Sequence, residues 1–126
     1  MYEYNAVVDR VVDGDTIDCT IDLGFSTWKK IRVRLEGINA PESRTRDKEE
    51  KAKGLITKAR LIEILNYNDN KCVLQVSGLG KFGRALASVY VTSLSPASED
   101  SSITLINVNQ QLITEGLAVE YHGGKR

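Results

Sequence analysis

Two short segments hold the residue types that could carry out chemistry in this chain. The first, Asp13-Gly14-Asp15-Thr16, places two carboxylates and a hydroxyl within four residues. The second, residues 34–42 (Arg-Leu-Glu-Gly-Ile-Asn-Ala-Pro-Glu), begins with an arginine and ends with an amide, a proline and a carboxylate. Brought together, they would form an oxygen-lined pocket suited to a hard divalent cation, with a guanidinium beside it. Residues 80–84 (Gly-Lys-Phe-Gly-Arg) supply a second arginine. A cation site with two arginines indicates a site that binds a phosphate ester.

Each of these segments has a plainer interpretation when it is taken alone. Asp-Gly flanked by alternating apolar residues is typical of a hairpin turn in which the glycine adopts a positive φ. An EF-hand loop is excluded, because the glycine and the distal glutamate are misplaced. We expect Asp13 to be structural, accepting hydrogen bonds within its own turn or contacting the site from outside. Lys81 and Arg84 alone are typical of solvated turn charges.

The elements that must position these residues follow from the apolar periodicity. Alternation predicts three strands, residues 4–12, 15–23 and 28–35, joined by short turns in a meander with one buried face. Further strands are predicted over residues 71–76 and 84–92, on either side of a glycine-rich turn, and a polar loop over residues 93–102. Residues 103–105 are expected to pair briefly with a neighbour, and residues 117–121 to form a last extended piece.

Two helices are predicted between and after these strands. Asp47 is expected to cap a helix of about five turns, with Glu50 completing a capping box, and Gly54 is expected to mark close packing against the sheet. Asn107 is predicted to cap a short helix that ends at Gly116. The side of the first helix expected to face the core consists of Ala52, Leu55, Ile56, Ala59, Ile62 and Leu65.

Five short strands with two to three helices suit an OB-fold, a mainly β, five-stranded Greek-key barrel. The pattern alone establishes a small β-barrel or an α+β domain. A length of 126 residues indicates a single domain, residues 1–126.

Composition limits the partners and the setting. With 17 basic and 17 acidic residues the net charge is zero, which argues against a strong non-specific grip on nucleic acid but not against a local basic surface. Residues 29–34 contain four basic side chains that could form such a surface. Cys19 and Cys72 lie in alternating segments and are expected to be buried hydrophobes without a bridge. Because the chain has no membrane-spanning run and no signal peptide, we expect a cytoplasmic monomer, although a mature secreted chain would look the same.

Four motifs occur in order between about residues 5 and 122: Asp-Gly-Asp-Thr, Arg-Leu-x-Gly-Ile-x-Ala-Pro-Glu, Lys-Phe-Gly-Arg and Gly-Leu-Ala. With them the chain resembles the staphylococcal nuclease (thermonuclease) family. The resemblance implies the OB-fold and metal-dependent hydrolysis of DNA, and of RNA as a further substrate, to 3′-phosphate products. It implies that Arg34 and Arg84 hold the scissile phosphate and that Glu42 orients the attacking water. The residues implied to contact the nucleotide are Lys81, Phe82 and Tyr121.

The metal ligands implied by the resemblance are Asp15, Asn39 and the backbone carbonyl of Ala40, around Ca²⁺. Asn39 departs from the family pattern, which usually has aspartate, so one negative charge is missing and Mn²⁺ or Mg²⁺ are alternative metals. Glu36 shares strand parity with Arg34 and is a candidate to restore that charge.

Three functions remain open from the sequence. The first is a nuclease acting on DNA or RNA, favoured because the implied catalytic residues are all retained. The second is a catalytically weakened relative that binds single-stranded nucleic acid through its OB surface. The third is an interaction module with no role on nucleic acid, for which neutral net charge is the support.

Overall fold

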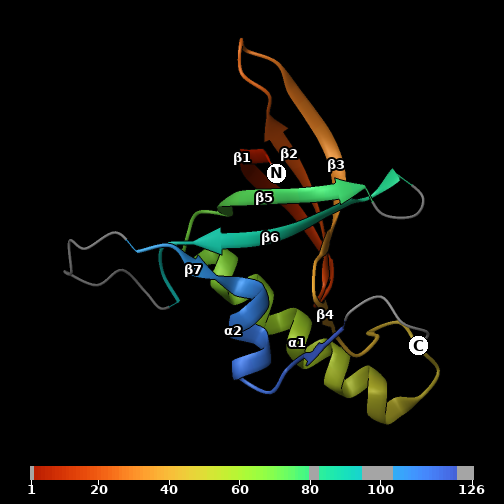
Figure 1. Ribbon diagram of the computed structural model, residues 1–126. Helices are drawn as coiled ribbons and strands as arrows, with labels where there is room; N and C mark the ends of the chain where they lie inside the picture. Colours follow the sequence, from red (N-terminus) through yellow and green to blue (C-terminus); the bar gives the residue numbers. More distant parts are fainter. Residues whose placement is uncertain (1, 80–82, 95–103, 122–126) are drawn as a thin grey trace.

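A computed structural model describes residues 2–79, 83–94 and 104–121. The predicted nucleotide contacts Lys81 and Phe82 and most of the predicted polar loop lie outside these residues. Figure 1 shows the elements in chain order: β1 (Tyr2–Asp13), β2 (Thr16–Asp22), β3 (Trp28–Leu35), β4 (Ile38–Asn39), α1 (Lys48–Asn66), β5 (Lys71–Leu79), β6 (Ala85–Val91), β7 (Ile106–Asn107), α2 (Val108–Thr114) and β8 (Val119–Glu120).

Five of the strands close into a mixed barrel. The order is β3-β2-β1-β5-β6, each neighbouring pair is antiparallel, and a parallel pairing of β3 with β6 closes the ring. The meander predicted for the first three strands is confirmed, as is the OB-fold. The short strand β7 extends the sheet beside β6, and β4 pairs with β8 in a separate two-stranded ribbon.

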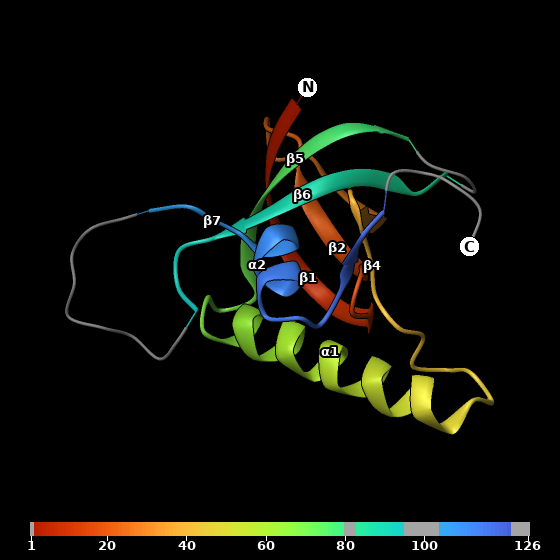
Figure 2. The ribbon, with the colours of Figure 1, turned by 60° about the horizontal axis from the view of Figure 1, so that its bottom comes forward.

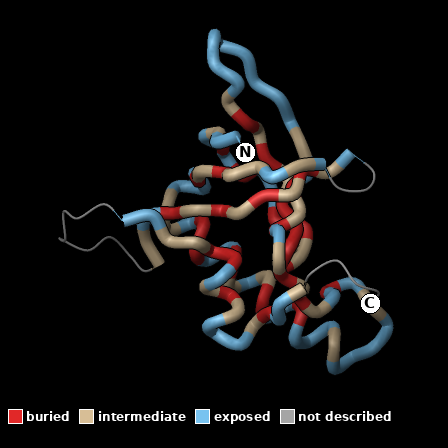
Figure 3. Tube along the Cα trace, in the orientation of Figure 1, coloured by how far each residue is buried: buried red, intermediate tan, exposed pale blue. Residues whose placement is uncertain are grey.

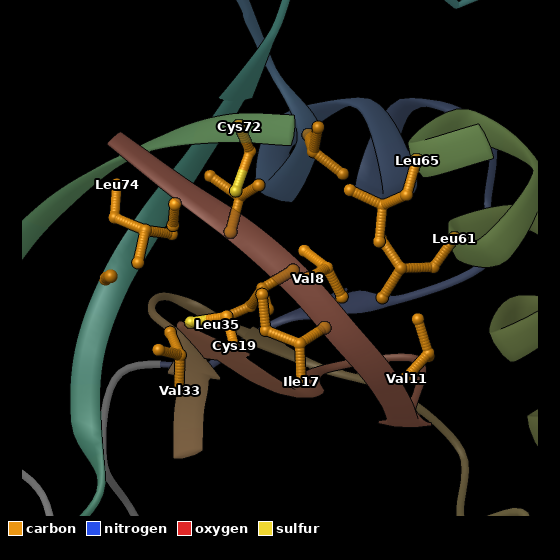
Figure 4. Packing of buried hydrophobic residues seen from close by; sticks show 14 of the residues in the cluster. Val8, Val11, Ile17, Cys19, Val33, Leu35, Leu61, Leu65, Cys72 and Leu74 are labelled. Atoms are coloured by element: carbon orange, nitrogen blue, oxygen red, sulfur yellow. The ribbon is translucent and has the colours of Figure 1, made fainter. Parts of the chain in front are cut away.

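The barrel is filled by alternate residues of its strands, which Figure 3 shows as buried positions along each strand. On β2 the buried alternate positions are Ile17, Cys19 and Ile21, whereas Leu23 is exposed because it lies past the end of the strand. Cys19 and Cys72 are free and buried, as predicted (Figure 4). Burial raises the pKa of each thiol to about 12, so both remain neutral hydrophobes at ordinary pH.

The cap of α1 is confirmed, but its capping box is not formed. The Asp47 carboxylate accepts hydrogen bonds from the backbone N–H groups of Glu49 and Glu50. The Glu50 carboxylate does not reach back to Asp47. It accepts a hydrogen bond from the N–H of Glu42 at 3.4 Å, so this side chain contacts the segment that carries a predicted catalytic residue.

The prediction of which face of α1 is buried was wrong. The buried positions are Gly54, Thr57, Leu61, Ile64 and Leu65, so only Leu65 was named correctly. The regular apolar stripe faces solvent instead, with Ile56 58% exposed. The helix lies along one end of the barrel (Figure 2), where its small residues approach the chain closely and its C-terminal leucines and isoleucine reach the core.

The second helix begins and ends as predicted. The Asn107 side chain accepts a hydrogen bond from the N–H of Gln110, and Gly116 has a φ of 75°. Residues 104 and 105 of the segment expected to pair are in no strand, and residue 103 lies outside the described part of the chain; the short pairing is made by the next two residues, β7. The last extended piece is β8. Neither described helix combines the length and the apolar character that crossing a bilayer would need.

Candidate active site

A polar cavity of about 490 Å³ opens where the β1–β2 turn, the end of β3, residues 40–44 and the start of β6 meet. Three carboxylates and three guanidiniums surround it, so the formal charges of its ionisable lining cancel. The lining residues are Asp13, Asp15, Thr16, Arg34, Ala40, Glu42, Arg44 and Arg84. All three predicted catalytic residues and two of the three predicted metal ligands are therefore brought together from four parts of the chain.

Asp15 and Arg34 form the best-defined contact of this cavity. The Nη1 atom of Arg34 lies 3.3 Å from Oδ2 of Asp15, with the side chains only 15% and 10% exposed. The same carboxylate oxygen accepts a hydrogen bond from the N–H of Ala40 at 2.8 Å, and Oδ1 accepts one from the hydroxyl of Thr16 at 3.0 Å. Arg34 also donates to the carbonyl of Leu35 at 3.2 Å. These contacts fix both groups before any ligand arrives.

Asn39 and Tyr121 lie against Arg34 rather than along the cavity wall. Oδ1 of Asn39 accepts a hydrogen bond from Nη2 of Arg34 at 3.4 Å, and Cζ of Arg34 lies 6.0 Å from the centroid of the Tyr121 ring. The pairing of β4 with β8 brings these two segments together, and the N–H of Tyr121 donates to the carbonyl of Gly37 at 2.9 Å. Glu36 is exposed and is not among the described residues that line the cavity.

The Asp13 carboxylate forms a hydrogen bond with a residue of another segment and not with its own turn. Its Oδ1 accepts a hydrogen bond from the hydroxyl of Ser43, which is buried. This bond ties the β1–β2 turn to the segment that holds Glu42 and Arg44. Ser43 was not predicted, because the two partners are 30 positions apart and nothing in either local pattern indicates the contact.

Gly14 serves close packing and not a left-handed turn. It is absent from the described glycines with positive φ. A Cβ at this position would lie 2.4 Å from Cγ2 of Thr57 and 3.1 Å from Cβ of Ala40. The turn that carries Asp15 is therefore pressed directly onto α1, which corrects the reason predicted for this glycine.

Gly54 of α1 also permits close packing, here against the segment that carries Glu42. A Cβ there would lie 2.4 Å from the carbonyl oxygen of Glu42 and 2.7 Å from that of Pro41. The predicted close packing is real, but the partner is the segment around Glu42 and not the sheet. The neighbouring hydroxyl of Thr57 donates to the carbonyl of Leu117 at 2.7 Å. One face of α1 thus contacts both site segments and the C-terminal segment.

The donor set beside Asp15 fits a hydrated hard cation. It consists of oxygens only: the carboxylates that line the cavity and the amide of Asn39 beside Arg34. Among the described residues, no three His, Cys, Asp or Glu side chains gather closely enough to hold a metal ion by themselves. A cation here would therefore complete its shell with water, with substrate oxygens, or with both.

Comparison with protein families identifies the family of this chain. A family model described as staphylococcal nuclease homologue matches residues 32–126, which is well over half of the chain. The comparison with curated proteins found no match. The matched span includes Arg34, Glu42 and Arg84, whereas Asp15 precedes it and joins them through the fold. The chain therefore belongs to the family of staphylococcal nuclease homologues.

Proposed function

We propose that this chain is a metal-dependent nuclease that hydrolyses phosphodiester bonds in DNA or RNA and leaves 3′-phosphate ends. One observation carries the proposal: Arg34 of β3, Arg84 just before β6 and the carboxylate of Glu42 line a single cavity beside a buried aspartate.

Arg34 and Arg84 are proposed to bind the non-bridging oxygens of the scissile phosphate. A guanidinium is planar, presents paired donors and stays protonated, so it can neutralise the charge that grows on the phosphoryl group. The contacts of Arg34 with Asp15, Asn39 and the carbonyl of Leu35 support this role, because a donor that is already oriented needs little reorganisation when the substrate binds.

Glu42 is proposed to orient the attacking water, either as a general base or by hydrogen bonding. Its side chain is exposed at the cavity, where a water molecule can reach it. Its backbone packs closely against Gly54, and its N–H donates a hydrogen bond to the carboxylate of Glu50. A carboxylate on a fixed backbone can place a water molecule in line with the leaving oxygen.

The proposed cation ligands are the Asp15 carboxylate, the Asn39 amide and the main-chain carbonyl of Ala40, and the proposed metal is Ca²⁺, with Mn²⁺ and Mg²⁺ as alternatives. When bound, the cation would stabilise negative charge on the phosphoryl oxygens. The neutral amide of Asn39 supports a second candidate function, in which the chain binds single-stranded nucleic acid and cuts it poorly.

Digestion of single-stranded DNA in EDTA, Ca²⁺, Mg²⁺ or Mn²⁺ tests both candidates. Cleavage should require a metal and leave 3′-phosphate ends, and Glu42→Gln and Arg84→Ala should each lower the rate by about 100-fold or more. The matched control is Arg46→Ala, because Arg46 is exposed and lies outside the cavity lining. If the natural chain cuts nothing with any metal while Asn39→Asp does cut, the binding function replaces the nuclease.

A further inference from the structure

A second groove continues from the cavity along β3. It has a volume of about 780 Å³ and shares Arg84 with the cavity, so the two are contiguous. We call it the β3 groove. Its described lining consists of Lys29, Lys30, Ile31, Arg32, Leu79, Gly83 and Arg84.

The β3 groove is cationic, unlike the charge-balanced cavity. Four of its described lining residues are basic and none is acidic. Lys29 and Lys30 are exposed and take part in none of the ion pairs among the described residues. Arg32 is held by Asp18 of β2 through two hydrogen bonds of 2.7 and 3.1 Å. The zero net charge of the whole chain therefore conceals a local basic surface.

Strand geometry sets the spacing of these cations. Lys30, Arg32 and Arg34 occupy alternate positions of β3, opposite Thr20, Asp18 and Thr16 of β2. Alternate residues on one face of a strand lie about 6.6 Å apart, which is comparable to the distance between neighbouring phosphates in an extended single strand. The parallel pairing of Val33 with Ala85 brings the preceding residue, Arg84, to the same side of the barrel.

Apolar groups lie between and beyond the cations. Ile31 is half-buried, and the side chain of Leu79 is exposed at the end of β5. Trp28, the single tryptophan of the chain, is 58% exposed at the start of β3 but lines a different pocket. A basic path with apolar groups beside it suits single-stranded nucleic acid, because phosphates meet the cations while sugars and bases cover the apolar surface.

We propose that the β3 groove binds the nucleotides that flank the scissile phosphate on one side, and so makes the chain prefer extended single strands to short substrates. This inference rests on the proposed nuclease function, since it takes the cavity as the place of cleavage. It makes Lys29 and Lys30 substrate-positioning residues, although neither belongs to the four sequence motifs. They would contact phosphates about two to three nucleotides away from the phosphate that is cleaved.

The test compares Lys29→Glu and Lys30→Glu with Lys71→Glu, an exposed strand lysine outside the β3 groove. Substrates are a 20-nucleotide oligothymidylate and the dinucleotide of the same base. For each groove variant, kcat/KM on the 20-mer should fall about tenfold more than on the dinucleotide, and Lys71→Glu should show no such difference. Binding of the labelled 20-mer, followed by anisotropy and by Trp28 fluorescence, should lose at least about 0.7 units of its log–log salt slope per variant.

Equal losses on both substrates, or equal losses in the Lys71 variant, would overturn the proposal. If the natural chain cuts neither substrate, the nuclease function fails, and the anisotropy titration still decides the groove. If the 20-mer binds more weakly to the two groove variants only, the β3 groove proposal is supported. If both variants bind the 20-mer as the natural chain does, the proposal is rejected.

Discussion

The Asp15 carboxylate and the Arg34 guanidinium meet in a largely buried ion pair, with Nη1 3.3 Å from Oδ2. The carboxylate proposed to hold the cation is therefore already partly neutralised by the arginine proposed to hold the phosphate. Asn39 contacts the same guanidinium through a neutral amide. Little negative charge is therefore available to a divalent cation here. A charged side chain at residue 39 would add to it, so substitution at this position is the most informative test of metal affinity.

Asn39→Asp should strengthen Ca²⁺ binding by about tenfold, or about 1.4 kcal/mol, because it adds a charged oxygen ligand without changing the shape of the side chain. Calorimetric titration with Ca²⁺ measures this directly, and the metal concentration for half-maximal DNA cleavage should fall in parallel. Asn5→Asp, at an exposed position on β1, controls for net charge. Unchanged affinity in Asn39→Asp would remove residue 39 from the ligand set.

Gly54→Ala should lower kcat on DNA by about tenfold or more, since the new Cβ would approach the Glu42 carbonyl oxygen to 2.4 Å and displace the segment that carries the proposed catalytic carboxylate. The gain of about 1 kcal/mol in helix propensity offsets part of the packing cost, so activity should suffer more than stability. Steady-state kinetics and urea unfolding measure the two effects. Gly78→Ala is the matched control, because its Cβ would meet nothing within 4 Å; full activity in Gly54→Ala would contradict this role.

Glu115→Gln should cost about 0.5 kcal/mol of stability at neutral pH, a modest value because the pair is partly solvated. Arg60 donates to both Glu115 oxygens at 2.7 and 3.0 Å, joining α1 to the end of α2, and holds the pKa of that carboxyl below its ordinary value of 4.5. A lowered folded pKa stabilises the protein above pH 4.5 and ceases to do so as the pH falls through the folded value. Urea unfolding across pH 2–7 should show the two proteins converge in acid, with Glu36→Gln as the exposed control.

Cys19 and Cys72 should resist iodoacetamide at pH 8 in the folded protein and react at once in urea. Both thiols are buried, and burial raises the pKa of each to about 12, so the reactive thiolate is scarce as well as inaccessible. Mass spectrometry of timed samples measures the labelling. Rapid labelling without denaturant would show that this part of the barrel opens locally.

The barrel was predictable because its signals are local. Alternation along each strand gave the buried set, and Asp47, Asn107 and Gly116 marked helix ends by chemistry that acts within one turn. The predicted residues that line the cavity could be found through the motifs, since each segment contributes its own group. The parallel contact that closes the barrel leaves no such local pattern.

The errors concern contacts between segments. The stripe of α1 that looked most apolar faces solvent, because small residues on the other side permit a closer approach to the site. Gly14 was assigned to backbone freedom although Thr57 explains it, and Glu50 was assigned to its own helix although it bonds to Glu42. In each case the partner lies too far along the chain for periodicity or capping rules to indicate it.

The parallel pairing of β3 with β6 also has a consequence for the order of folding. The pairing joins two residues that are far apart in the sequence, Val33 and Ala85, and completes the ring of strands. Contacts of such long sequence separation carry a high loop-closure entropy and tend to form slowly. An intermediate in which β6 has not docked keeps the β1–β2 turn with Asp15 beside Arg34 of β3 but lacks the second guanidinium. The proposed binding of a phosphate by both arginines would therefore require the completed barrel, and its appearance during refolding would report that the last strand has docked.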